Sequence, residues 1–212
     1  YGSEVASGTA DTLTATLNDV GAAKTTTAAE KQMTLTSTDV ESLTIVSKGT
    51  ANYADLSGVD DATDLTVSGS GDLKVTDAGA SVAEFDAGEA TGDVDLDLAG
   101  STFKAGTFGS GDDKLTTDAL KVDFTLTGGE GDDELEVKDI GADDTLAPTM
   151  TGVETLNFVE QTAAVTFDGS AVEDLETLMV TDGFGDGGTD DITVSGLSGS
   201  SYTVNFHETT GG

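Results

Sequence analysis

The sequence has no cysteine, tryptophan or arginine, and it has only one proline and one histidine among 212 residues. Without cysteine, disulfide frameworks, thiol catalysis and cysteine-based zinc sites are excluded. The single histidine, His207, and the lack of His-Glu-x-x-His and Gly-x-Ser-x-Gly motifs leave no basis for zinc hydrolysis or a serine triad. We therefore expect a protein that is not an enzyme.

Positive charge is also scarce. Eight lysines face 41 acidic residues, which gives a formal net charge of -33. Such a surface repels phosphate backbones and anionic lipid headgroups, so we expect no nucleic-acid partner, and metal cations are the natural ligands. No apolar run approaches the ~20 residues that span a bilayer, so we expect no direct membrane insertion.

Large apolar residues are few as well. Leu, Ile, Val and Phe account for 47 of the 212 residues, which is close to the ~20 % below which a highly charged chain is disordered. Something must therefore offset the self-repulsion of this chain.

Short segments in which apolar and polar residues alternate dominate the sequence. A period of two predicts strands, and the Gly-, Asp- and Ser-rich clusters between these segments predict turns. Helical patterns are short and weak, at 22–32 and 171–176. The clearest alternating segments are 13–17, 65–67, 94–98, 122–126, 165–167 and 202–206.

A motif recurs every 21 or 22 residues, with strand centres near residues 115, 136, 157 and 179. The segments 152–158 and 174–180 are near-copies placed 22 residues apart. A fixed period of this size is typical of a solenoid, in which each repeat forms one coil. A two-sheet sandwich, which also has closely spaced strands, remains the alternative.

Two glycine-rich stretches contain the best candidate metal-binding residues. Residues 128–136, Gly-Gly-Glu-Gly-Asp-Asp-Glu-Leu-Glu, match every fixed position of the nonapeptide Gly-Gly-x-Gly-x-Asp-x-apolar-x of calcium-binding β-rolls, and residues 108–116 match all but the first glycine. The copies are 20 residues apart, about one coil, so we expect an ion between stacked turns, bound by backbone carbonyls and Asp113 and Asp133. Hard oxygen donors suit Ca²⁺. An ordinary acidic glycine turn is the alternative.

The expected fold class is therefore all-β: a right-handed parallel β-solenoid, or irregular β-roll, with calcium-binding Gly-Asp turns. Other acidic turns are weaker candidates for a metal site. Residues 69–72 with Asp77 fit a solvated turn better than an ion site, and 93–104 fail as an EF-hand loop because Lys104 stands where a Glu is required. A glycine-rich loop that could hold another ion is surrounded by Asp182, Asp186, Asp190 and Asp191.

This combination resembles the RTX (repeats-in-toxin) proteins exported by type I secretion, and among them the surface-layer proteins of Gram-negative bacteria of the Caulobacter type. The stretches 108–116 and 128–136 carry the RTX resemblance, and 153–158, 175–180 and 55–59 carry the surface-layer one. Only two good copies are present, and the coils are nearer 21 than 18 residues. By position, the residues that match the calcium loops are Gly109, Gly111, Asp113, Gly129, Gly131 and Asp133, with Asp112 and Asp132 at the variable position.

The resemblance implies a single β-solenoid segment, residues 1–212, of a longer secreted protein at the bacterial cell surface. Its calcium ions would order the solenoid and mediate self-association into a two-dimensional lattice. Two other functions stay open: the stalk or ligand-binding module of a large RTX adhesin, and the calcium-binding tail of a type I-secreted hydrolase.

Overall fold

The computed structural model describes residues 10–26, 28–118, 123–138, 144–159, 164–181, 192–198 and 202–207. These residues form 19 β-strands and no α-helix, which confirms the all-β prediction. The weak helical patterns at 22–32 and 171–176 were wrong, since the described part of both segments is non-helical. Accordingly, no helix of these ranges is long and apolar enough to cross a membrane.

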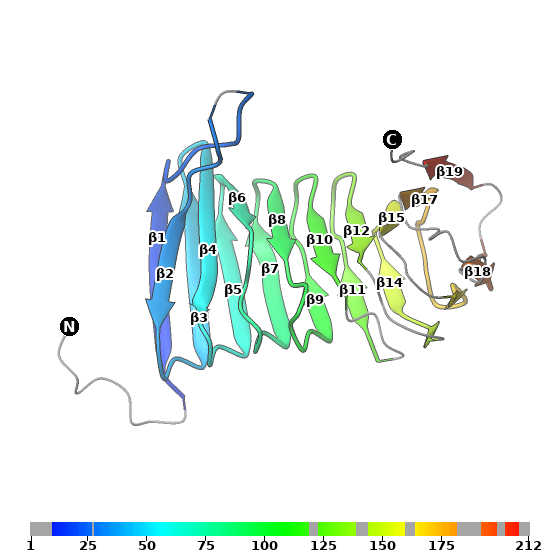
Figure 1. Cartoon of the computed structure of the whole chain (residues 1–212), viewed down its shortest axis with the longest axis horizontal. Coiled ribbons are helices and arrows are strands. Elements are labelled where there is room, and N and C mark those ends of the chain that lie inside the picture. Colours follow the sequence, from blue (N-terminus) through cyan, green and yellow to red (C-terminus); the bar gives the residue numbers. More distant parts are fainter. Residues whose placement is uncertain are drawn as a thin grey trace.

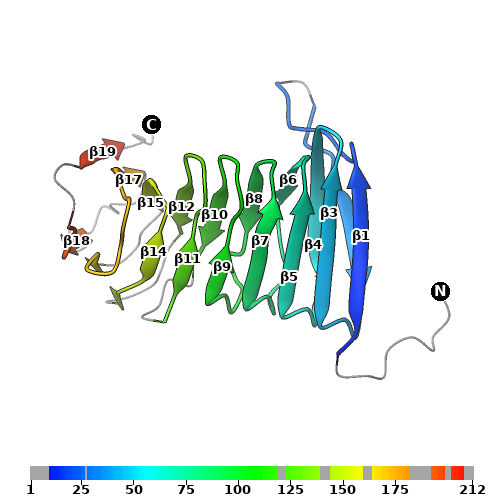
Figure 2. The same cartoon turned by 180° about the vertical axis from the view of Figure 1, so that it is seen from behind.

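The chain winds into coils that stack along one axis, as Figures 1 and 2 show from opposite sides. The first sheet contains, in spatial order, β1 (Thr12–Asn18), β3 (Ser42–Lys48), β5 (Asp64–Gly69), β7 (Glu84–Ala90), β9 (Ala105–Thr107), β11 (Thr125–Thr127) and β14 (Thr149–Thr151). The second sheet contains β2 (Met33–Ser37), β4 (Ala51–Val59), β6 (Asp72–Val75), β8 (Val94–Asp97), β10 (Lys114–Thr117), β12 (Glu134–Val137), β15 (Thr155–Val159), β17 (Thr177–Thr181) and β19 (Thr203–His207). A third sheet contains β13 (Asp144–Leu146), β16 (Val165–Asp168) and β18 (Ile192–Ser195).

All pairs between these strands are parallel, and each strand pairs with the equivalent strand of a neighbouring coil. The 21- to 22-residue period therefore marks one coil, and the sandwich alternative is wrong. Because the pairing is parallel, side chains at equivalent positions of successive coils stack on one another. In the second sheet, the residues that stack in this way are Leu96, Leu115, Leu135 and Leu156.

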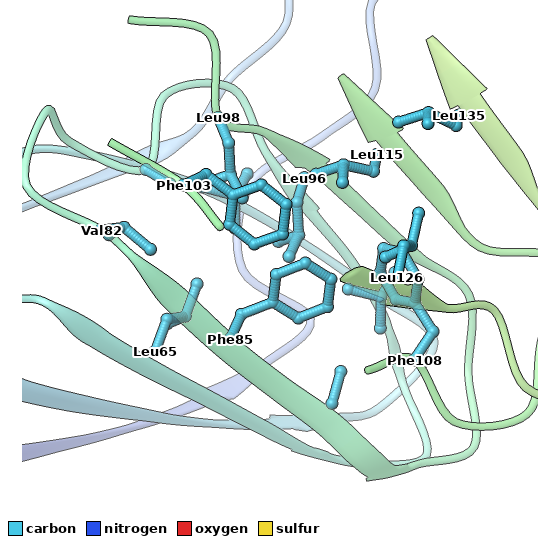
Figure 3. Packing of buried hydrophobic residues seen from close by; sticks show 14 of the residues in the cluster. Leu65, Val82, Phe85, Leu96, Leu98, Phe103, Phe108, Leu115, Leu126 and Leu135 are labelled. Carbon is cyan, nitrogen blue, oxygen red and sulfur yellow. The ribbon is translucent and has the colours of Figure 1, made fainter. Parts of the chain in front are cut away.

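Buried apolar residues fill the space between the sheets in one continuous cluster. Its most aromatic part joins neighbouring coils: the Phe85 ring lies 5.3 Å from that of Phe103 and 4.7 Å from that of Phe108 (Figure 3). Phe103 in turn contacts Phe124 edge-on at 5.2 Å. Burying such side chains stabilises the fold by about 1.5–3 kcal/mol each, which offsets part of the charge repulsion.

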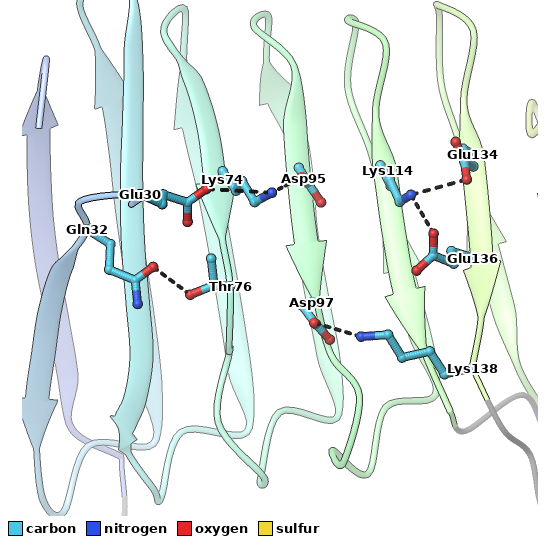
Figure 4. Close-up of polar contacts among 10 residues, drawn as sticks. All are labelled: Glu30, Gln32, Lys74, Thr76, Asp95, Asp97, Lys114, Glu134, Glu136 and Lys138. Atoms are coloured by element: carbon cyan, nitrogen blue, oxygen red, sulfur yellow. Dashed lines mark hydrogen bonds and ion pairs between the residues drawn. The ribbon is translucent and has the colours of Figure 1, made fainter. Parts of the chain in front are cut away.

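The outward face of the second sheet carries ion pairs that link coils (Figure 4). The Lys114 ammonium lies 3.2 Å from Glu134 and 2.7 Å from Glu136, and Lys138 lies 3.1 Å from Asp97. Such half-exposed pairs stabilise by about 0.2–1 kcal/mol each. Asp97 thus lies on an outward strand face, as expected for a segment that is not an EF-hand loop.

Candidate metal centre

The two nonapeptide turns lie on the same edge of the solenoid, on successive coils. Each connects a strand of the first sheet to a strand of the second: 108–113 follows β9, and 128–133 follows β11. Ser110 and Glu130 form a parallel bridge between the turns, with Gly111 N–H donating to the Glu130 carbonyl and Glu130 N–H to the Gly109 carbonyl, both at 3.0 Å. The structure therefore brings the two predicted motifs together.

Glycine is required where these turns stack. Gly129 and Gly131 have φ angles of 109° and 132°, which L side chains rarely adopt. A Cβ atom on Gly129 would overlap the carbonyl oxygen of Gly109, and one on Gly131 would overlap that of Gly111. The glycines thus let carbonyl-bearing backbone from adjacent coils approach closely.

Asp113 and Asp133 lie inside these turns, and each is only 2 % exposed. Oδ1 of Asp113 accepts a 2.7 Å hydrogen bond from Val94 N–H, and Oδ1 of Asp133 accepts a 2.8 Å bond from Asp113 N–H. The second oxygen, Oδ2, of both carboxylates is buried and has no hydrogen-bond partner. A buried carboxylate oxygen without a partner is costly, and a cation is the ligand that would compensate it.

Asp113 and Asp133 begin a stack that continues to Glu154, whose Oε2 accepts a 2.8 Å hydrogen bond from Asp133 N–H. We call Asp113, Asp133 and Glu154 the inner column. In the coils before it, Leu73 and Val94 occupy the same register and are buried. The buried position therefore changes from apolar to acidic at Asp113. Sequence reasoning missed Glu154 because no nonapeptide surrounds it; its register with Asp133 was the available signal.

Asp112 and Asp132 lie one residue earlier, are exposed, and belong to a second stack. This outer column consists of Asp72, Asp93, Asp112 and Asp132. Each of its later members donates its backbone N–H to Oδ1 of the preceding one: Asp93 to Asp72 at 3.2 Å, Asp112 to Asp93 at 2.9 Å and Asp132 to Asp112 at 3.1 Å. The two columns therefore bond in opposite directions along the axis.

Comparisons with known proteins leave the chain without relatives to which it can be assigned. No family model, no curated protein and no solved structure matches it. The assignment of this site therefore depends on its geometry and electrostatics.

Burial and neighbouring carboxylates raise the pKa values of the two inner aspartates. Burial raises the pKa of Asp113 to about 7, and the nearby carboxylates of Asp133 and Asp93 raise it further against the opposing effects of the backbone N–H groups of Val94 and Gly109. Burial likewise raises the pKa of Asp133 to about 6, with Glu154 and the outer aspartates adding to the effect. A divalent cation beside these groups would favour their charged forms.

Side chains alone do not complete a coordination shell. Among the described residues, no group of three His, Cys, Asp or Glu side chains is arranged to hold a metal ion. The six to eight oxygens that Ca²⁺ takes would have to include backbone carbonyls and water beside Asp113 and Asp133. Carbonyl-rich glycine turns are suited to this chemistry. The other candidates, Asp182, Asp186, Asp190 and Asp191, lie outside the described residues.

Proposed function

We propose that this chain is a calcium-stabilised structural segment of a bacterial surface layer, secreted by the type I route, which assembles with copies of itself into an extracellular lattice and has no catalytic role. The observation that supports calcium binding most strongly is the pair of buried carboxylates, Asp113 and Asp133, each with an unpartnered oxygen in stacked glycine turns.

Calcium would act on stability by mass action. An ion that binds only the folded coils stabilises them, and extracellular modules bind Ca²⁺ with dissociation constants of about 0.1–1 mM. At tenfold excess over the dissociation constant, one site contributes about 1.4 kcal/mol. Such sites stay empty in a low-calcium cytoplasm and fill outside the cell, which keeps the chain loose for export.

The negative charge also determines what assembly of the copies would require. Copies with a net charge of -33 repel one another, and monovalent salt screens this repulsion beyond ~8 Å without linking surfaces in a defined direction. A divalent ion shared by acidic turns of neighbouring molecules both reduces the repulsion and links the two surfaces in a defined direction. The acidic segment 182–191, which lies outside the described residues, and the exposed outer column contain carboxylates that could form such bridges.

Two measurements test the proposal. Circular dichroism and thermal unfolding in chelator and in millimolar Ca²⁺ should show a more ordered and more stable protein with calcium; identical curves would contradict calcium binding. Light scattering should then show association in millimolar Ca²⁺ that sodium chloride of equal ionic strength does not produce. Stabilisation without association would favour the adhesin stalk instead, because a rod of in-register coils also suits a stalk.

A further inference from the structure

We propose a second cation site one coil beyond the nonapeptide pair, between the turn 128–133 and the turn 150–154. Its ligands are Asp133 Oδ2, the carbonyl oxygen of Gly152 and the carboxylate of Glu154. This inference rests on the proposed calcium-dependent function, but no nonapeptide marks residues 150–154, so the sequence motif does not include it.

The unpartnered oxygen of Asp133 points into this second space. A Cβ atom on Gly128 would lie 2.5 Å from Asp133 Oδ2 and would overlap the Gly152 carbonyl oxygen. The two oxygens therefore converge on the same side of Gly128, from two different coils. No residue in the described ranges donates a hydrogen bond to either of them. Two oxygens that face each other without a donor repel, and a cation between them removes the repulsion.

The Gly152 peptide is held in place for this role by the following coil. Gly152 has a φ of 61°, and its N–H donates a 3.2 Å hydrogen bond to Oδ2 of Asp174. The backbone of Gly129 packs directly against it, since a Cβ on Gly152 would lie 3.1 Å from both the nitrogen and the oxygen of Gly129. The turn around Gly152 therefore packs directly against the second nonapeptide turn.

The inner column can also accept more than one divalent ion. When ionised, Asp113, Asp133 and Glu154 carry three negative charges in register, one more than a single divalent ion balances, and the neighbouring Lys114 forms its ion pairs with Glu134 and Glu136 instead. Oδ2 of Asp113 and Oδ2 of Asp133 are both buried without a hydrogen-bond partner, on two successive coils. We assign one divalent ion to each of them.

The column has defined ends, which limits the number of ions. Val94 precedes Asp113 in the same register with an apolar, buried side chain. Glu176 follows Glu154, since β15 and β17 pair in register, but its side chain is exposed. Glu176 therefore provides a matched control for Glu154: the same residue type at the same register, one coil later and in solvent.

The test counts ions bound to the whole chain by calorimetry and native mass spectrometry. Relative to the unaltered protein, we expect Glu154→Gln to lose one bound Ca²⁺, Asp113→Asn to lose a different one, and Asp133→Asn to lose both, whereas Glu176→Gln keeps the full number. Glu154→Asp, which keeps the carboxylate on a shorter side chain, should weaken one binding event at least about tenfold.

The outcomes separate the two proposals. If Ca²⁺ binds and Asp113→Asn loses an ion, but both Glu154 variants bind with unchanged number and affinity, the second site is wrong and the proposed function stands. If the unaltered chain binds no Ca²⁺, both are wrong. Should Glu154→Gln not fold in calcium by circular dichroism, Glu154→Asp gives the decision, since it retains the acceptor for Asp133 N–H.

Discussion

The backbone N–H of Asp113 donates a 2.8 Å hydrogen bond to the carboxylate of Asp133, which lies 20 residues later and one coil further along the solenoid. The same bond joins Val94 to Asp113 and Asp133 to Glu154. Each inner carboxylate therefore uses one oxygen to bond the preceding coil, and in Asp113 and Asp133 the second oxygen is buried without a hydrogen-bond partner.

Asp113→Asn should make the calcium-free protein more stable and reduce the stabilisation that calcium adds. Asp113→Asn keeps the acceptor for Val94 N–H but removes a desolvated charge. We therefore expect it to raise the free energy of unfolding in chelator by a few kcal/mol at pH 8, and to reduce the additional stabilisation given by millimolar Ca²⁺. Urea unfolding in both conditions measures this. Asp112→Asn, in the exposed outer column, is the control and should change neither value appreciably.

The metal-free protein should lose stability as the pH rises from about 4 to about 7. Burial raises the pKa of Asp113 to about 7 and that of Asp133 to about 6, above the ~3.9 of an unfolded Asp. In this window the folded state binds more protons than the unfolded state, so its stability is greatest at the acidic end. Urea midpoints in chelator at pH 5 and pH 8 test this. The double variant Asp113→Asn, Asp133→Asn should show a flatter profile; a midpoint higher at pH 8 would contradict the assignment.

Comparing Gly129→Ala with Gly100→Ala separates the effect of close stacking on stability from the effect of a positive φ. Gly129→Ala adds a Cβ that overlaps the Gly109 carbonyl oxygen, whereas Gly100, with a φ of 83°, has nothing within 4 Å of a Cβ. Gly100→Ala should therefore cost about 1–2 kcal/mol, from its positive φ alone. We expect Gly129→Ala to cost several kcal/mol and to abolish calcium binding at this turn. Equal losses of stability would show that the turns do not stack this closely.

On β4, the position equivalent to the inner column is occupied by Asn52, and we expect no ion there. Asn52 pairs with Leu73 in the column that later holds Asp113, and it is 1 % exposed. Its Nδ2 donates 2.8 Å hydrogen bonds to Ser47 Oγ and to the Lys48 carbonyl, and its Oδ1 accepts a 2.9 Å bond from Val20 N–H.

Asn52→Ala should therefore lower the free energy of unfolding by about 2–3 kcal/mol, equally in chelator and in calcium, because it leaves buried backbone groups without partners. Thermal or urea unfolding in both conditions tests this. Asn205→Ala, at an exposed position of β19, is the control and should have little effect. A loss seen only in chelator would mean that an ion replaces the amide.

The sequence was sufficient to predict the solenoid because its 21- to 22-residue period and its apolar–polar alternation both indicate β-strands on stacked coils. Strand centres expected near 115, 136, 157 and 179 fall in β10, β12, β15 and β17. Placing the two nonapeptides on adjacent coils followed from their spacing. The helical pattern at 22–32 failed because backbone pairing overrode local propensity: Ala22 and Lys31 form an antiparallel bridge.

The rest of the site depends on three-dimensional register. Glu154 has no motif around it, and only the pairing of β12 with β15 places it after Asp133. The opposite bonding directions of the inner and outer columns depend on which way each backbone N–H points in the turn. That orientation is a property of the folded backbone, which residue types alone do not determine.

The hydrogen-bonded edge also determines where the chain tolerates a change in length. Along the inner column, the bonded residues are 19, 20 and 21 positions apart, and along the outer column 21, 19 and 20. The same bonds form at every step although the coils differ in length. Differences in coil length are therefore accommodated elsewhere in each coil. The hydrogen-bonded carboxylate edge itself keeps the same geometry from coil to coil. Peptide tags or loops grafted into this rod belong away from that edge, where natural variation in length is already accommodated.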